Sequence, residues 1–180
     1  SVLAAKGAGA VDYSRRSGKT VLHMDIGGGT ANLALIRDGK ITATGCVNVG
    51  GRLVKFDETG RITYLSPALT GLTDVKAGNS AEEGALYAIA QILAAALETA
   101  AGRGNQPIPE GLFTREAENR WEPPQEPVTV SFSGGVAAAM DSHPTDPLAY
   151  GDLGIYLADK HTLAQKLPYW AKQLIIGLLF

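Results

Sequence analysis

The chain has 180 residues, 45% of them hydrophobic and 19% charged, which predicts one globular domain, or a lobe of a larger protein, with a buried core. Lys and Arg number 16 against 18 Asp and Glu, and the resulting net charge of −2 argues against a protein that binds nucleic acid. The single cysteine, Cys46, rules out an internal disulfide and indicates a reducing, cytoplasmic setting. No apolar run approaches the roughly 18 to 20 residues that cross a bilayer, so we expect a soluble protein without a membrane partner.

The two ends of the sequence suggest a piece of a longer protein. The chain begins at Ser1, and it stops in an apolar segment, 174–180, that would normally need a covering partner. Near the start, an alanine-rich stretch ends in two arginines followed by Gly18, a pattern typical of the end of a helix. We therefore expect a helix within residues 1–19, ahead of the first strand.

The first strands are predicted to form two hairpins. Five strand-like segments precede the longest helix: 21–26, 32–37, 40–47, 53–56 and 61–65. Asp38-Gly39 separates the second and third of these and is the signal of a two-residue type I′ turn. The first three strands should therefore be antiparallel neighbours, and the last two should form a second hairpin.

The longest helix is predicted to begin at Ser80. Ser80 and Glu83 have the S-x-x-E spacing of a capping box, in which each side chain binds a free N–H of the first turn. Four apolar residues then recur at helical spacing: Leu86, Ile89, Leu93 and Leu97. They predict one buried stripe along the helix.

The remainder of the chain contains a long excursion and shorter elements. Residues 102–127 hold too many glycines and prolines for a continuous element, so we expect a surface excursion there. A strand over 128–132, short helices over 136–140 and 152–160, and a C-terminal helical segment over 161–180 complete the prediction.

The most informative motif is Asp25-Ile26-Gly27-Gly28-Gly29-Thr30-Ala31-Asn32, on a tight turn between two strands. Successive glycines let a backbone approach a ligand and direct neighbouring N–H groups at one anion. An Asp at the end of a strand could hold Mg²⁺ through water, and Thr30 and Asn32 add neutral donors. The alternative is a hairpin that uses glycine only for its backbone conformation. Strand, Asp, three glycines and Thr together favour a phosphate site.

Two further glycine pairs follow strand-like segments. Ser133-Gly134-Gly135-Val136 joins a strand to the start of a helix and could pass its backbone against a ribose or adenine, although such joints are often only structural. Gly50-Gly51 fits a close approach of two backbones or an ordinary turn equally well. Arg52 beside it is expected to be solvated, although it could contact a phosphate.

The order of these pieces resembles the second lobe of the actin, Hsp70 and sugar kinase superfamily. A strand ending in DIGGGT, a hairpin, VNVGGRL, a long helix and VSFSGGVA succeed one another over about residues 20–140. Longer strings resemble the EutA family of ethanolamine ammonia-lyase reactivating factors, over about residues 6–154: KGAGAVDYSRR, HMDIGGGTANLALIRDGKI, CVNVGGRLV, SFSGGVA and YGDLG.

The resemblance implies an α/β fold, namely an actin-like ATPase (ribonuclease H-like) lobe with a mixed sheet, antiparallel first three strands and flanking helices. Residues 1–19 would lead in from a missing first lobe, and 20–160 would form the second lobe. The two superfamily loops would contact the nucleotide: Asp25, Gly27, Gly28, Gly29, Thr30 and Asn32 around the phosphates, and Gly134, Gly135 and Val136 on the adenosine side. Asp25 would hold Mg²⁺ through water.

The implied function is that of an ATP- and Mg²⁺-dependent, chaperone-like factor. It would eject damaged cobalamin from ethanolamine ammonia-lyase so that intact adenosylcobalamin can enter. The resemblance places the protein in the cytoplasm, in association with a bacterial microcompartment, and leaves a homodimer open. The sequence contains no second Asp-x-Gly-Thr turn, so ATPase activity is expected only of an intact two-lobed protein.

Two other classes of protein remain open. A sugar or acetate kinase relative would phosphorylate a small alcohol or carboxylate, and it would need a base beside the acceptor, which the sequence does not single out. A non-catalytic interaction module would use the glycine turns only as architecture and would present residues 102–127 to a partner. Substitutions at Asp25 and Gly28 distinguish such a module from a nucleotide-dependent factor, because its partner affinity should not respond to them.

Overall fold

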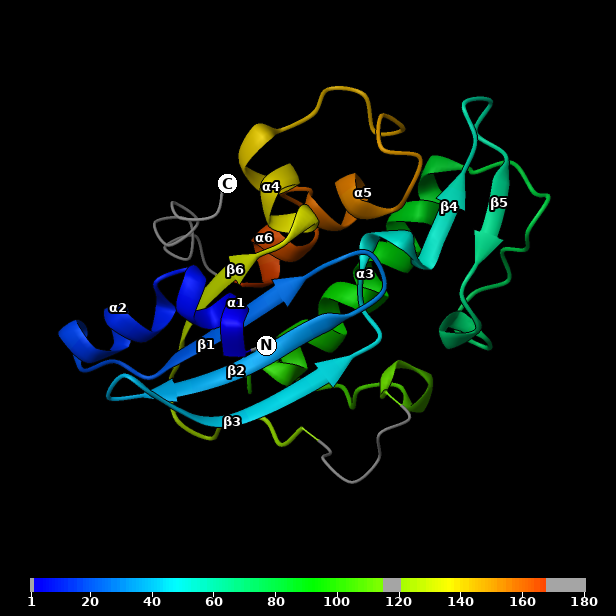
Figure 1. Cartoon of the computed structure of the whole chain (residues 1–180). Helices are drawn as coiled ribbons and strands as arrows, with labels where there is room; N and C mark the ends of the chain where they lie inside the picture. Colours follow the sequence, from blue (N-terminus) through cyan, green and yellow to red (C-terminus); the bar gives the residue numbers. More distant parts are fainter. Residues whose placement is uncertain (1, 115–120, 168–180) are drawn as a thin grey trace.

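The computed structural model describes residues 2–114 and 121–167, and a mixed four-stranded sheet organises them (Figure 1). Its strands are β1 (Val21–Ile26), β2 (Ala31–Arg37), β3 (Lys40–Val47) and β6 (Thr129–Ser133), in the order β3-β2-β1-β6. β1 and β2 are antiparallel, as are β2 and β3, whereas β1 and β6 are parallel. The predicted antiparallel arrangement of the first three strands is thus confirmed.

Both predicted hairpins are present. Asp38 and Gly39 connect β2 to β3 with φ values of 49° and 71°, the positive values that a type I′ turn requires at both central positions. The second hairpin pairs β4 (Val54–Phe56) with β5 (Ile62–Leu65) in a separate two-stranded sheet. It stands beside one end of the main sheet (Figure 1).

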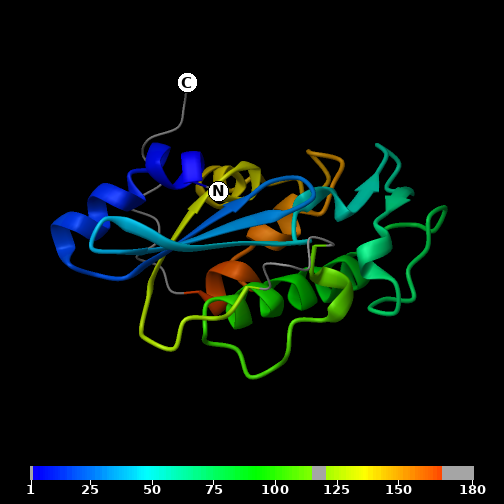
Figure 2. The ribbon, with the colours of Figure 1, turned by 60° about the horizontal axis from the view of Figure 1, so that its bottom comes forward.

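Helices cover the two faces of the main sheet. Alternating residues of β1 point to opposite faces, so Val21 packs with α1 (Val2–Gly7) and α2 (Ala10–Ser17), whereas Leu22 belongs to the main core under α3 (Glu83–Ala100). Figure 2 shows α3 and the short α6 (Leu163–Lys166) on one side of the sheet and the two N-terminal helices on the other. His23 and Asp25 alternate onto the face of Val21.

The N-terminal helical segment is two helices instead of the single one that was expected. Gly9 lies between α1 and α2 with a φ of 72°, a left-handed conformation that a continuous α-helix does not allow. The predicted helix end is confirmed: Gly18, with a φ of 66°, donates its N–H to the Ser14 carbonyl.

The predicted start of the longest helix is wrong by three residues. α3 begins at Glu83, and no side chain caps its first turn. Ser80 instead forms an isolated bridge with Arg61, and the Ala81 N–H donates to the Gly60 carbonyl, so the β4–β5 hairpin holds this segment extended. The four-residue stripe predicted for the helix is buried.

The excursion over residues 102–127 lacks continuous secondary structure, as predicted, but it is not wholly at the surface. Among its described residues, Ile108, Leu112 and Trp121 are buried. The Trp121 indole N–H donates to the Ala100 carbonyl at 2.8 Å. Prolines and glycines prevent a regular element, but the hydrophobic effect still buries the apolar side chains between them in the core.

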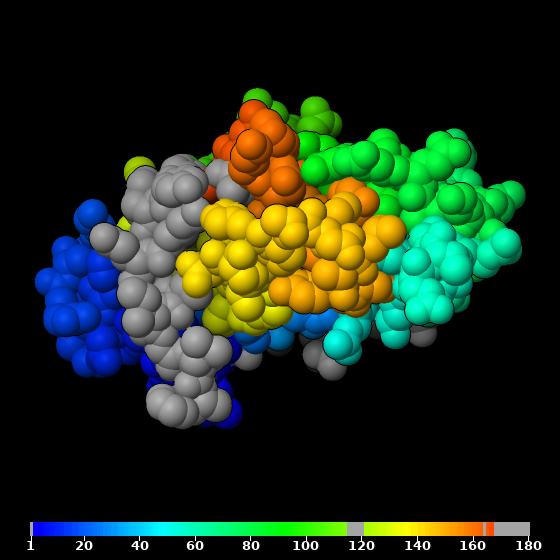
Figure 3. Space-filling view, turned by 90° about the horizontal axis from the view of Figure 1, so that it is seen from above, coloured from blue at the N-terminus to red at the C-terminus, as the bar shows by residue number. Residues whose placement is uncertain are grey.

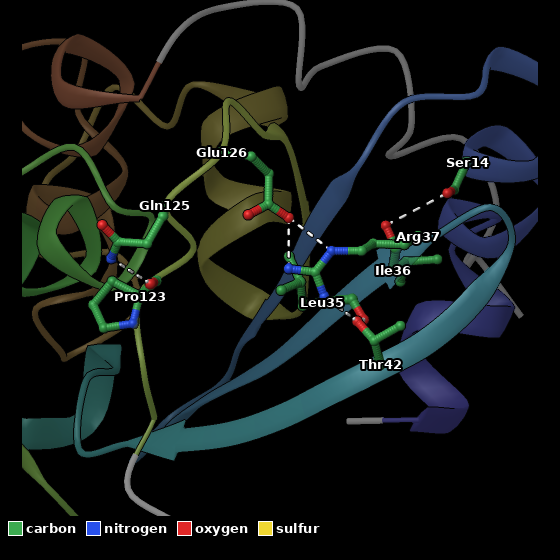
Figure 4. Close-up of polar contacts among 8 residues, drawn as sticks. All are labelled: Ser14, Leu35, Ile36, Arg37, Thr42, Pro123, Gln125 and Glu126. Atoms are coloured by element: carbon green, nitrogen blue, oxygen red, sulfur yellow. Dashed lines mark hydrogen bonds and ion pairs between the residues drawn. The ribbon is translucent and has the colours of Figure 1, made fainter.

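An ion pair fixes the end of the excursion to the sheet (Figure 4). Arg37, at the end of β2, donates its Nε–H to Oε1 of Glu126 at 2.7 Å, and its Nη1 group donates to Thr42 Oγ1 on β3. Both side chains of the pair are more than a third exposed, so its main effect is to orient the chain leading into β6.

Short helices follow β6 in the described part of the chain, before and including α6. α4 (Gly135–Ser142) matches the helix predicted over 136–140, whereas α5 (Gly154–Ala158) is shorter than the one predicted over 152–160. Segments 135–142 and 154–158 lie side by side on the face seen from above (Figure 3). Of the predicted C-terminal segment, 168–180 lies outside the described residues. No helix in the described part of the chain has the length and apolarity to span a membrane.

Candidate functional site

The turn between β1 and β2 keeps two backbone amides free. The Gly27 N–H donates to the Thr30 carbonyl at 3.0 Å and so closes the turn. Within the described ranges, no residue accepts a hydrogen bond from the N–H of Gly28 or Gly29. Only these two of the three glycine amides can therefore bind an anion.

The later Ser-Gly-Gly bend lies directly beside this turn. Gly134 has a φ of 89°, and a β-carbon there would come within 2.4 Å of the Ile26 carbonyl oxygen and 3.1 Å of Asp25 Oδ1. A side chain would therefore push the two loops apart. Parallel pairing of β1 with β6 produces this contact, because both strands deliver their carboxyl ends to the same edge of the sheet.

Three polar residues form a row across the ends of β2, β1 and β6. Asp25 is paired with Asn32 on one side and with Ser133 on the other, so the three side chains share one face of the sheet. Ser133 Oγ donates to Asp25 Oδ1 at 2.6 Å. No described residue hydrogen-bonds Oδ2 of Asp25, and since no unpartnered side-chain oxygen is buried in the described part, Oδ2 reaches solvent.

A buried histidine extends this row into the protein. His23 is completely buried, and its Nδ1 lies 2.9 Å from Ser131 Oγ while its Nε2 lies 3.1 Å from Ser133 Oγ. Because the Ser133 proton is donated to Asp25, His23 must donate from Nε2 and accept from Ser131 at Nδ1. Burial lowers the pKa of His23 from 6.5 to about 4, although the Asp25 charge opposes this shift. The ring is therefore neutral near pH 7.

A third loop packs against the glycine turn through its backbone. The N–H of Gly51 donates to the Gly27 carbonyl, and that of Arg52 donates to the Gly28 carbonyl at 2.6 Å. A β-carbon on Gly50 would lie 2.4 Å from the Gly28 oxygen. Of the two interpretations of Gly50-Gly51, the structure supports the close approach of two backbones.

A fourth loop completes the site. Gly151 and Asp152 precede α5, and Asp152 Oδ1 accepts the Gly154 N–H at 2.8 Å. A β-carbon on Gly51 would lie 2.9 Å from the Gly154 α-carbon, so these two loops are also in backbone contact. Asp152 Oδ2 faces the Nε of Arg52 at 3.8 Å. Loops 27–30, 50–52, 133–135 and 151–154 therefore meet at one end of the sheet.

The structure gathers most of the predicted site residues at this meeting point. Thr30 contributes its carbonyl to the turn, and Gly135 has open space where a β-carbon would be. Val136 is 2% exposed and packs in the main core, so its side chain is not available to a ligand. Only its backbone in the first turn of α4 faces the bend.

The hydrogen bonds that join Asp25 to Ser133 and His23 were not predicted from the sequence. The sequence places His23 on the same face as Asp25, because residues i and i+2 of a strand share a face, whereas no local pattern relates Ser133 to Asp25. The register between β1 and β6 decides the pairing, and no sequence pattern specifies it. Asp152 was missed because it reaches the site through contacts between two loops that are distant in the sequence.

A protein-only metal cluster is absent from the described ranges, where no three His, Cys, Asp or Glu side chains could hold an ion together. The free oxygen of Asp25 is a carboxylate ligand that suits a hard cation. One carboxylate with water and phosphate oxygens is a coordination set that suits Mg²⁺.

The comparisons with known proteins agree with the motifs in these loops. The family model described as "Ethanolamine utilisation protein EutA" matches residues 1–173. This chain belongs to the EutA family. The EutA-family chain is 34% identical over 171 residues to the ethanolamine ammonia-lyase reactivase EutA of Salmonella typhimurium (strain LT2), and 35% identical over 166 residues to that of Escherichia coli K12.

The alignments with both relatives cover 88% of this EutA-family chain but 34% of each relative, so the chain spans about a third of their length. No solved structure matches the chain. The matched range includes all four loops of the site.

Proposed function

We propose that this chain is the nucleotide-binding lobe of a reactivating factor for ethanolamine ammonia-lyase, and that the factor uses ATP and Mg²⁺. The EutA relatives are named ethanolamine ammonia-lyase reactivases, which supports the lyase as partner. The topology of three antiparallel strands, a helix and a parallel strand supports an actin-like lobe. A second lobe, supplied by the rest of the protein, would close over the nucleotide.

One observation carries the nucleotide part of the proposal. The free amides of Gly28 and Gly29 lie on the turn that follows Asp25, and the Gly134 bend is in van der Waals contact with that turn. Backbone amides bind phosphate oxygens, and a side-chain-free bend admits a flat base or a sugar. Both loops follow the carboxyl ends of β1 and β6, the edge where open α/β sheets bind ligands, which supports the proposal.

The residues around Asp25 would prepare it for a cation. Ser133 occupies Oδ1 and fixes the carboxylate, while Oδ2 stays free to accept from metal-bound water. Neutral His23 behind Ser133 adds no competing positive charge. Bound Mg²⁺ would neutralise phosphate charge during transfer. Asp25 would orient its water shell, and the Gly28 and Gly29 amides would hold the phosphate oxygens.

Calorimetric titration of MgATP and MgADP tests the proposal. The 180-residue chain should bind both weakly, and the two-lobed protein should bind both more tightly and hydrolyse MgATP. Asp25→Asn keeps the acceptor for Ser133 and should reduce affinity about tenfold, whereas the exposed Asp141→Asn should not change it. Equal affinity for Asp25→Asn and wild type, or no binding by the two-lobed protein, would contradict the proposal.

The lyase part needs a separate experiment. Ethanolamine ammonia-lyase inactivated with a cobalamin that lacks the adenosyl group should regain activity when the two-lobed protein, MgATP and adenosylcobalamin are added. Release of the inactive cobalamin should depend on Asp25. Release that is unaffected by Asp25→Asn would favour an interaction module in which the glycine turns are only architectural.

A further inference from the structure

Arg52 carries an unused cationic group at the rim of the glycine turn. Its backbone N–H binds the Gly28 carbonyl, and its side chain crosses Gly28 so closely that a β-carbon there would lie 2.9 Å from Arg52 Cδ. The side chain is nevertheless 68% exposed. Within the described ranges no acceptor lies within hydrogen-bond distance of its guanidinium, which faces only Asp152 at 3.8 Å.

The neighbouring carboxylate is fixed and the arginine is not. Asp152 is 15% exposed and accepts the Gly154 N–H, so its position is set by the turn before α5. The Arg52 side chain crosses Gly28 with its methylene groups, and its guanidinium is exposed to solvent. The separation of 3.8 Å and the exposure of the arginine make the ion pair weak, so a phosphate can replace Asp152 at low cost.

We propose that Arg52 is a phosphate-binding residue, and that its guanidinium exchanges Asp152 for the ligand's phosphate oxygens when a polyphosphate binds the Gly28 and Gly29 amides. The inference rests on the proposed nucleotide site and adds a specific cation to it. Guanidinium offers a planar pair of donors that matches two phosphate oxygens. The two amides and Arg52 would contact the phosphate from adjacent loops, 27–30 and 50–52.

Three probes separate this role from simple packing over Gly28: MgADP, inorganic pyrophosphate with Mg²⁺, and adenosine. Arg52→Met keeps an unbranched apolar stem over Gly28 and removes the charge. In calorimetry on the two-lobed protein, Arg52→Met should weaken the binding of MgADP and of pyrophosphate about tenfold and leave the binding of adenosine unchanged. Arg52→Lys should lose less affinity for MgADP and pyrophosphate than Arg52→Met. Arg16→Met, on exposed α2, is the control and should bind all three probes like wild type.

Asp152 provides an independent test of the exchange. Asp152→Asn keeps an oxygen for the Gly154 N–H but removes the charge that competes for Arg52, so pyrophosphate should bind several-fold more tightly. Weaker pyrophosphate binding by Asp152→Asn would overturn the exchange. If Arg52→Met loses affinity for adenosine and for MgADP equally, the effect is structural, and this result would overturn the phosphate role of Arg52.

The outcomes also separate this inference from the proposed function. If Asp25→Asn weakens MgADP while Arg52→Met does not, the nucleotide site stands and the role of Arg52 is wrong. If the wild-type two-lobed protein binds neither MgADP nor pyrophosphate, the proposed function fails and the inference fails with it. The melting temperature of Arg52→Met without ligand should match wild type, which excludes unfolding as the cause of lost binding.

Discussion

Gly50 lies so close to Gly28 that a β-carbon on Gly50 would come within 2.4 Å of the Gly28 carbonyl oxygen and 2.6 Å of its carbonyl carbon. Both atoms belong to the backbone and cannot rotate away. The contact joins the loop after β3 to the turn after β1, and it brings Arg52 to the rim of the site. Gly50 is therefore required for the approach of the two loops and not for an unusual backbone angle, since its φ of −175° is extended.

Gly50→Ala should destabilise the protein by about 1 to 3 kcal/mol, the usual cost of inserting a methyl group where the surroundings cannot yield. Urea unfolding followed by circular dichroism measures the change. Gly29→Ala is the matched control in the facing turn: it has open space at the β-carbon position and a φ outside the left-handed region, so its stability should stay close to wild type. Equal effects of the two substitutions would disprove the close approach.

Protonation of His23 should destabilise the protein in acid. Its pKa in the folded state is about 4, below the 6.5 of an exposed histidine, so the unfolded chain binds a proton first as the pH falls. The contribution of neutral His23 to the free energy of unfolding is fully present above pH 6.5 and is lost between pH 6.5 and 4. The loss should be about 3 kcal/mol, because each unit of pKa difference corresponds to 1.36 kcal/mol.

Urea unfolding at several pH values between 7 and 4 tests this dependence. His23→Gln should have a flatter profile across the window than wild type, whereas the exposed His161→Gln should follow wild type. A wild-type profile that is already flat between pH 6.5 and 4 would contradict a depressed pKa.

Removing the Ser133 hydroxyl should cost about 1 to 3 kcal/mol of stability, because Asp25 loses a donor and the buried His23 Nε2–H loses its acceptor. Ser142→Ala is the comparison, since the exposed Ser142 hydroxyl bonds only a carbonyl of its own helix. Thermal and urea unfolding of the two variants should differ clearly. If they unfold alike, the serine and histidine chain does not stabilise β1 against β6.

Trp121 should anchor the excursion to the core. Its side chain is buried against Gly45, and a β-carbon added to Gly45 would lie 2.6 Å from Trp121 Cε3. Trp121→Ala should lower the free energy of unfolding by about 3 to 5 kcal/mol. Trp121→Phe should lower it less, because that change keeps an aromatic ring and removes only the donor to the Ala100 carbonyl. Tyr150→Ala, at a half-exposed aromatic, should change stability by about 0.5 kcal/mol or less. Similar urea midpoints for Trp121→Ala and Tyr150→Ala would contradict the anchor.

Local patterns predicted the hairpins and the antiparallel strands because their signals lie within a few residues. Asp38-Gly39 specifies a turn by backbone conformation alone, and the neighbouring alternation fixes the strands on either side. Ser80 failed as a helix cap because a distant bridge to Arg61 holds its backbone extended. Local capping preference is worth about 1 kcal/mol, which tertiary contacts readily exceed.

The site was predictable in part for the same reason. Asp25 and the glycines that follow it are contiguous, so their motif could be identified directly. The hydrogen bond from Ser133 to Asp25 spans 108 residues of sequence, and the contact of Arg52 with Asp152 depends on two loops that no short pattern relates. Long-range register and backbone docking therefore determined which polar groups surround the motif.

The meeting of four loops at one end of the sheet also affects folding. The site exists only after β6 has aligned with β1, so an unfolded chain offers a ligand none of its combined contacts. A ligand held there would bind the native state alone, and at a hundred times its dissociation constant it would add about 2.7 kcal/mol to the free energy of unfolding. A shift in melting temperature with ligand concentration would thus measure occupancy of the site without any assay of turnover.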